Sequence, residues 1–239
     1  MTFLGPANGE ATGINSNGDV IGTRNLGSSD RTNLWSPSGT LTNPYPTVNS
    51  RGAVINDNGQ FAGTTNNGTV GYYSPGGASP RTSLGAFLPT DMTNDRVLSG
   101  SVGTDAGILT FDTNSLANIG KLSPTVAFAS ALGLNNSLTA VGVSQGSDAF
   151  IWDSTLSMRS LTELLDSQFA GWTILSASDI NDNGMIIATG RFNGVDQAVL
   201  LTNITAVPEP SSLAFSAIAG ILVVRLRCRQ KMHKRILQK

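Results

Sequence analysis

The chain has very few of the residues on which many catalytic and metal sites depend. It contains one cysteine, Cys228, and one histidine, His233, and both lie near the C-terminus. An intrachain disulfide is therefore excluded, and so is a zinc site built from Cys and His side chains. The body of the chain also lacks the histidine that a Ser-His-Asp or Cys-His arrangement needs.

Two kinds of segment are scarce as well. Helical periodicity is nearly absent from the body, and its best candidate is the short stretch 161–169. Residues 1–6 have neither a basic n-region nor an apolar h-region, so no secretory signal peptide is visible there. We expect the natural start of the protein to lie upstream of Met1.

What the chain does contain is glycine, with 27 residues, and many Asn, Ser and Thr residues between short apolar runs. This composition favours short strands linked by tight turns. Residues 1–204 are long enough for one all-β domain. We therefore predict an all-β body followed by a linker at 205–212, a membrane helix at 213–226 and a basic cytoplasmic tail at 227–239.

An internal repeat organises the body. Each copy carries the pattern apolar, Asn, polar, polar, Gly or its equivalent, followed by a short apolar run. The Asn-containing boxes begin at Asn15, Asn56, Asn94, Asn135 and Asn181, and the third copy is the most degenerate. The closing positions are residues 22, 63, 100, 142 and 188, which are separated by 41, 37, 42 and 46 residues.

A repeat of this length predicts about four short strands, which is one blade of a β-propeller. Five copies predict a propeller of about five four-stranded blades. The fifth copy ends near Leu201 without a fourth strand, whereas residues 2–5 precede the first copy. We therefore predict that Phe3 pairs beside residues 197–201, closes the ring and removes its exposed edges.

Two repeated features have a structural and a functional interpretation. The Asn-Asp-Asn-Gly boxes at 56–59 and 181–184 offer oxygen ligands of the type that Ca²⁺ binds, but they lack the glutamate of an EF-hand loop. They are better explained as two-residue hairpin turns. Aromatic residues recur at one position of the repeat and are expected to fill the space between blades. Trp172 lies outside that register and is the candidate ligand contact.

Carboxylates are the remaining candidates for catalysis. Asp179 with Asp182, or Asp91 with Asp95, could form an acid and base pair at the mouth of the propeller, as in glycoside hydrolysis. A polysaccharide-acting hydrolase is therefore the alternative to a non-enzymatic protein. Residues 1–224 carry eight basic and 16 acidic residues, a net charge of −8, which disfavours nucleic acid as a partner.

The C-terminal tail differs from the body in charge and hydropathy. An apolar run of 12 residues, 213–224, is followed by 15 residues with seven basic and no acidic side chains. The run covers roughly 18 Å of a hydrocarbon core about 30 Å thick, so flanking arginines must snorkel. A basic cluster of this kind holds the end of a membrane segment on the cytoplasmic side, and the body would then lie outside the cytoplasm.

The order Pro-Glu-Pro, apolar run and basic cluster resembles the PEP-CTERM sorting signal of bacterial exported proteins. The resemblance implies that a membrane exosortase processes the tail. The protein would first be anchored in the membrane by its C-terminus and would then be located at the cell surface or outside the cell. It assigns the sorting motif to Val207, Pro208, Glu209 and Pro210, and the membrane stop to Arg225, Arg227 and Arg229.

The repeat itself resembles the HAF repeats of bacterial extracellular proteins, although no copy keeps the histidine of that name. Together the two resemblances imply an exported, cell-surface or matrix-associated protein without a catalytic site or cofactor. Its partner would be an extracellular polysaccharide or another surface protein. A permanent membrane anchor without processing is a further alternative.

Overall fold

The computed structural model describes residues 8–44, 49–65, 70–73, 87–145 and 148–202. This part of the chain consists of strands in five antiparallel sheets. The prediction of an all-β body with one sheet per repeat is therefore confirmed. Within 161–169 the only helical element is a short 3-10 turn, η1 (Ser167–Phe169), which Asp166 caps at its N-terminus.

Each sheet is a simple meander in which consecutive strands pair. The first sheet has β1 (Gly9–Ile14), β2 (Val20–Asn25), β3 (Asp30–Trp35) and β4 (Leu41–Thr42). The second has β5 (Ser50–Ile55), β6 (Phe61–Thr65) and β7 (Val70–Tyr73). The third has β8 (Phe87–Met92), β9 (Val97–Val102), β10 (Asp105–Thr110) and β11 (Ser115–Gly120).

The fourth sheet has β12 (Ala129–Leu134), β13 (Ala140–Ser144), β14 (Ala149–Asp153) and β15 (Ser157–Ser160). The fifth has β16 (Trp172–Ile180), β17 (Ile186–Phe192) and β18 (Val195–Leu201). Four strands were predicted for every repeat, and three of the five sheets have them in the described residues.

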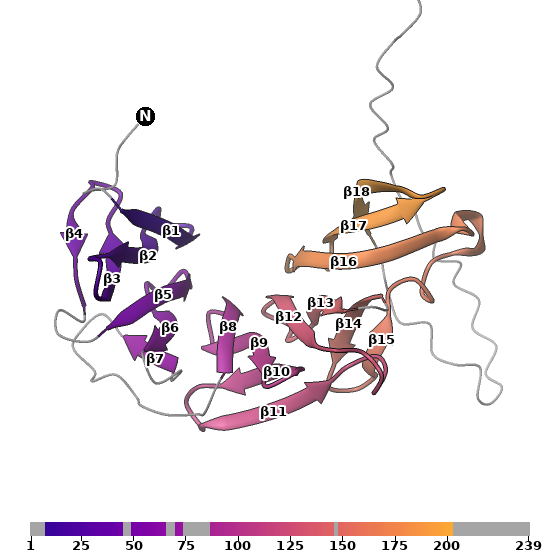
Figure 1. Ribbon diagram of the computed structural model, residues 1–239, viewed down its shortest axis with the longest axis horizontal. Coiled ribbons are helices and arrows are strands. Elements are labelled where there is room, and N and C mark those ends of the chain that lie inside the picture. Colours follow the sequence, from indigo (N-terminus) through magenta and orange to yellow (C-terminus); the bar gives the residue numbers. More distant parts are fainter. Residues whose placement is uncertain (1–7, 45–48, 66–69, 74–86, 146–147, 203–239) are drawn as a thin grey trace, which may run out of the picture.

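The sheets stack face to face in chain order and follow an arc (Figure 1). The first and the last sheet form its two arms, and the side between them is open. The five described sheets follow an open arc and do not form a ring, so the predicted closed propeller is not seen in the described residues. Phe3 and the predicted membrane helix lie outside the described residues. Among the described residues, no helix is long and apolar enough to span a membrane.

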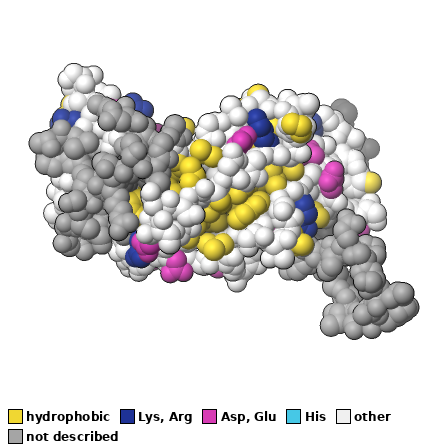
Figure 2. Space-filling model, turned by 90° about the horizontal axis from the view of Figure 1, so that it is seen from below, with side chains coloured by type: hydrophobic (Ala, Val, Ile, Leu, Met, Phe, Trp, Pro, Cys, Tyr) yellow, Lys and Arg dark blue, Asp and Glu magenta, His cyan; other side chains and the backbone are white. Residues whose placement is uncertain are grey.

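The hydrophobic core is divided among the four interfaces between neighbouring sheets. Ile21 and Phe61 pack between the first two sheets. Phe87, Leu98 and Leu109 fill the second interface, together with Val54 and Ala62. The third interface contains Ile108, Leu134 and Phe150, and the fourth contains Val141, Ile174 and Ile186. Figure 2 shows hydrophobic side chains gathered in the middle of the face that is seen from below.

In the first four sheets the recurring glycine of the repeat lies beside a recurring bulge. The first strand of every sheet shifts register near this place, for example between Ala131 and Gly133 in β12, and β16 has a second shift. The shift brings the first strand close to the second, so a Cβ atom at Gly142 would lie 2.0 Å from the Ser130 carbonyl oxygen. Gly22, Gly63 and Gly100 have the same close approach, at 2.0 to 2.1 Å.

Candidate functional site: the turns on the inner side of the arc

The first strands of the five sheets converge with their C-terminal ends on the inner side of the arc (Figure 1). The polar box of each repeat forms the turn that follows. In the first turn, the Asn15 N–H donates to the Asp19 carbonyl and the Gly18 N–H donates to the Asn15 carbonyl. Gly18 has a φ of 82°. The same bonds recur at Asn56 and Asn181.

These turns are hairpins, as predicted, but their loops contain three residues rather than two. Only the last loop residue takes a positive φ, and it is glycine in three of the turns. This is a type I turn followed by a left-handed residue, which is a common three-residue hairpin. Arg96 and Leu138 occupy the left-handed position in the third and fourth turns, with φ values of 62° and 60°.

The recurring asparagine has two roles, neither of which was predicted from the sequence. Inside its own turn, Asn135 Oδ1 accepts from the backbone N–H groups of Ser137 and Thr139, at 3.1 and 2.9 Å. Its Nδ2 donates to the Asn181 carbonyl of the next sheet at 3.3 Å. In the same way, Asn15 Nδ2 donates to the Asn56 carbonyl at 3.1 Å. The side chain therefore caps one turn and ties it to the following one.

A second row of hydrogen bonds runs through the residues that follow these asparagines. The backbone N–H of each residue donates to a side-chain oxygen one repeat later: Ser16 to Asp57 at 2.9 Å, Asp57 to Asn94 at 3.0 Å, Asn94 to Asn136 at 3.1 Å and Asn136 to Asp182 at 2.8 Å. Their sequence separations are 41, 37, 42 and 46 residues, which are the spacings of the repeat. We call these two rows the turn ladder.

The ladder stabilises two carboxylates in their ionised form. The pKa of Asp57 is lowered because the backbone N–H and side chain of Ser16, and the side chain of Asn94, donate to it. The pKa of Asp182 is lowered by the backbone and side-chain N–H groups of Asn136. The charge of Asp57 opposes the second effect. The oxygens of the boxes thus accept hydrogen bonds between sheets.

The calcium interpretation gains no support from these contacts. Among the residues that the structure describes, no three His, Cys, Asp or Glu side chains form a group that could hold a metal ion. The hydrogen bonds that Asp57 and Asp182 accept in the turn ladder account for the acidic residues of the boxes.

The carboxylate pairs predicted from the sequence are not those that the structure brings together. Asp182 belongs to the ladder, and Asp95 is exposed in the third turn. The charge of Asp179 acts on Asp91 instead, and both carboxylates adjoin β12: the Leu134 N–H donates to Asp91, and a Cβ atom at Gly133 would lie 3.0 Å from Asp179 Oδ1. Both aspartates directly follow the bulge of their first strand, and this shared repeat position was the signal that could have paired them.

Asp91 is the carboxyl group with the most unusual environment in the described part of the chain. Burial raises its pKa, and the charge of Asp179 acts in the same direction. The N–H groups of Leu134 and Met92 donate to its two oxygens, at 2.8 and 2.7 Å, and oppose that rise. Asp91 therefore joins β8 to β12 and is at the same time a candidate proton donor.

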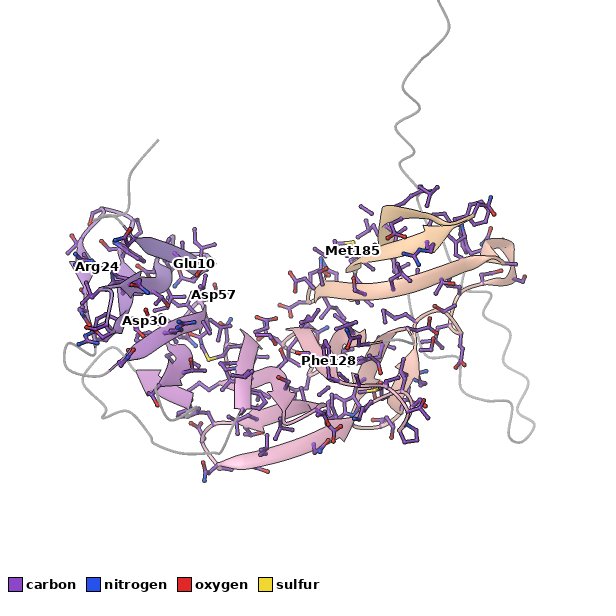
Figure 3. The ribbon with its side chains drawn as sticks, viewed as in Figure 1. Glu10, Arg24, Asp30, Asp57, Phe128 and Met185 are labelled. Atoms are coloured by element: carbon purple, nitrogen blue, oxygen red, sulfur yellow. The ribbon has the colours of Figure 1, made fainter. Side chains whose placement is uncertain are left out.

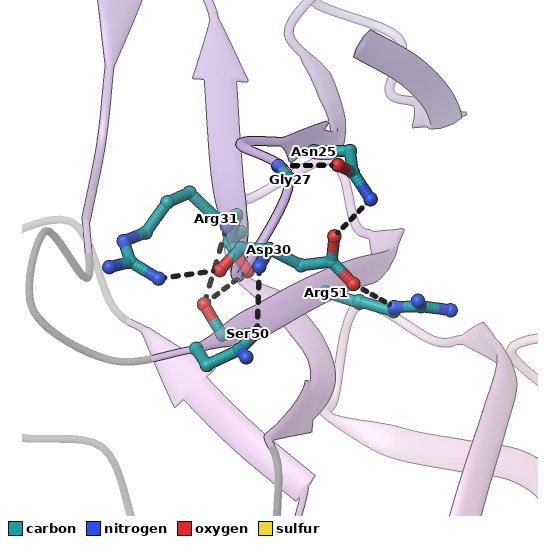
Figure 4. Close-up of polar contacts among 8 residues, drawn as sticks. Asn25, Gly27, Asp30, Arg31, Ser50 and Arg51 are labelled. Atoms are coloured by element: carbon teal, nitrogen blue, oxygen red, sulfur yellow. Dashed lines mark hydrogen bonds and ion pairs between the residues drawn. The ribbon is translucent and has the colours of Figure 1, made fainter. Parts of the chain in front are cut away.

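A cleft of about 590 Å³ lies between the first two sheets. Glu10, Thr12 and Asn25 line one side, and Arg51 lines the other. Asp30 also lines the cleft and accepts from Arg51 Nε at 2.5 Å and from Asn25 Nδ2 at 3.0 Å (Figures 3 and 4). The side chain of Asp30 is only 13% exposed, so this ion pair ties β3 to β5.

The recurring aromatic residues lie between sheets, as predicted: Trp35, Phe111 and Phe150 are buried. Trp172, the candidate ligand contact, is half-buried at the start of β16. Its ring stacks on Phe192, with centroids 5.2 Å apart and planes inclined by 16°. One side of Trp172 is thus engaged in the sheet, and it packs against the core of the fourth interface.

The sorting motif at Val207, Pro208, Glu209 and Pro210 and the arginines at 225, 227 and 229 lie outside the described residues. No protein-family model matches the chain, and a search of curated proteins finds no similar one.

Proposed function

We propose that this chain is an exported bacterial protein of the cell surface or extracellular matrix, with a non-enzymatic binding or structural role. Its tail would hold it in the membrane until an exosortase processes it near Pro208 and Pro210. The observation that carries the proposal is the sharp change of charge, from −8 over residues 1–224 to +7 over 225–239. Such a cluster beside an apolar run favours a cytoplasmic C-terminal end.

The turn ladder supports the structural part of this proposal. Most polar side chains of the repeat boxes hold one sheet to the next, so the repeated chemistry of the chain builds a scaffold. The blade-like order of the sheets also supports a propeller-type scaffold, in which the inner turns surround an axis. A polysaccharide or another surface protein is the partner that we propose for it.

The tail can be tested by the mass of the mature protein. The full chain would be expressed behind a secretory leader in a bacterium that has an exosortase, and in the same strain without that enzyme. We expect a mature protein without residues 225–239 only in the first strain. Glu209→Ala should leave the chain unprocessed, whereas Ser211→Ala serves as the matched control. Retention of residues 225–239 in both strains would favour the permanent anchor and contradict processing.

One observation favours a hydrolase as the second candidate. The pair formed by half-buried Asp91 and exposed Asp179 has the asymmetry of an acid and a base in glycoside hydrolysis. In that case Asp91→Asn would abolish the release of reducing sugar from an extracellular polysaccharide, and Asp95→Asn would not change it. Equal release by both variants would exclude this pair.

A further inference from the structure

The turn ladder has two unfinished ends. At the last turn, Asn181 Nδ2 and the Asp182 N–H match the donors that the earlier turns direct to the next turn, although the third turn has Thr93 in place of the asparagine. Within the described residues, these two donors of the last turn meet no acceptor. At the first turn, the Asn15 carbonyl and Ser16 Oγ occupy the places where later turns accept. The two ends therefore carry complementary hydrogen-bonding groups.

Burial shows the same asymmetry. Asn15, Asn56 and Asn135 are buried under the sheet that follows, whereas Asn181 is exposed. Ile187 is 52% exposed, although Ile21, Ala62 and Val141 are fully buried at its position in the first, second and fourth sheets. Leu200 pairs with Ile187 on the same side of the sheet and is exposed too. The last sheet thus presents the face that other sheets use for stacking.

The first sheet shows the opposite half of the contact. Ile14 is 69% exposed, whereas Met92, Leu134 and Ile180, at the same position of later sheets, are buried. In the interface between the first two sheets, Ile21 and Ile55 lie together beside Gly13 and Gly52. Ile187 and Ile14 are their equivalents at the two free ends.

We propose that the open face of the last sheet, around Asn181, Ile187 and Leu200, docks on the first sheet of a second copy of this chain, around Ile14, Asn15 and Ser16. The first turn is the suitable acceptor because the later turns already accept from the sheet before them. The two faces lie on opposite arms of the arc, where Glu10 and Met185 mark their positions in Figure 3. The two faces lie at the two ends of the stack of sheets, so each is available to a different copy.

The contact is heterologous, because each copy contributes a different face. Such interfaces produce rings when the rotation closes and open chains when it does not. The inference does not depend on the tail or on export, and it goes beyond the proposed function by naming the partner of one surface.

Sedimentation of the full chain in a non-ionic detergent tests the docking, since the detergent keeps the tail from driving association. We expect concentration-dependent association that weakens at least about tenfold in Ile187→Asp and in Ile14→Asp, because each places a charge in an apolar contact. Leu88→Asp is the matched control, because Leu88 is 54% exposed in the middle of the arc. A monomer at every concentration, or an equal effect of the control, would overturn the proposal.

Crosslinking separates docking between copies from closure within one chain. Ile14→Cys and Ile187→Cys chains, both also carrying Cys228→Ser, would be mixed and treated with a short bismaleimide. A crosslinked dimer that contains one chain of each kind is expected. A chain that carries both substitutions would also be treated at high dilution. If its residues 14 and 187 were crosslinked while the product kept the mass of one chain, the contact would form within one chain and docking between copies would be refuted.

Discussion

The fourth and the fifth sheet follow the same repeat, but only the fourth is covered on both faces. Val141 of β13 is fully buried under the fifth sheet, whereas Ile187, at the same place in β17, is half exposed. Asn135 is buried and bonded to the next turn, whereas Asn181 caps only its own. The comparison shows that the repeat encodes a contact with a following sheet in addition to its own fold.

The strongest way to break this comparison is Gly142→Ala in the fourth sheet. The added Cβ would lie 2.0 Å from the Ser130 carbonyl oxygen, where the backbone of the bulge leaves no space. We expect a loss of at least about 3 kcal/mol in the free energy of unfolding, which is severe for a single methyl group. Urea unfolding followed by tryptophan fluorescence would measure it.

The fifth sheet supplies the control, because it already has Ala188 at this position. β16 differs from the other first strands by a second register shift, between Ile174 and Ser176. We therefore expect Ala188→Gly to cost only about 0.5 to 1 kcal/mol, the usual penalty of glycine in a strand. Similar losses in the two variants would show that the bulge does not require glycine.

The local features of the repeat could be predicted from the sequence because short-range geometry determines them. The asparagine that caps four of the turns and the glycine that closes four of the units recur at nearly fixed spacing, so their strands and turns were found. The predicted two-residue turn was wrong, since Asn17 and Asn58 do not need a positive φ when the next glycine takes it.

Contacts between repeats were harder to predict, since they depend on how the sheets stack. Nothing in the spacing shows that Asn135 Nδ2 reaches the Asn181 carbonyl. The curvature of the arc depends on side-chain packing at four interfaces. For this reason the sequence predicted a closed ring where the described residues form an open arc.

A milder test compares Asn135→Ala with Asn181→Ala. Both substitutions remove an oxygen that accepts from two backbone N–H groups of its turn. Only the first also removes a bond to the following sheet. We expect Asn135→Ala to lower the free energy of unfolding by about 1 to 1.5 kcal/mol more than Asn181→Ala. Equal losses would mean that the ladder adds nothing between these two sheets.

The smallest effect is expected from acid at the contact between the fourth and fifth sheets. The pKa of Asp182 is lower in the folded protein, so its contribution is complete above the unfolded value near 4 and disappears as the pH falls through the folded value. Asp182→Asn should therefore flatten the decline of the melting temperature below pH 4. Because Asp182 is exposed, its contribution to the free energy of unfolding is less than about 1 kcal/mol.

Asp91 has a raised pKa in the folded protein, so its ionisation disfavours folding as the pH rises through this folded pKa. Asp91→Asn should hence remove a loss of stability that occurs above pH 4. If both variants changed the same pH range, the opposite assignment of these two carboxylates would be wrong.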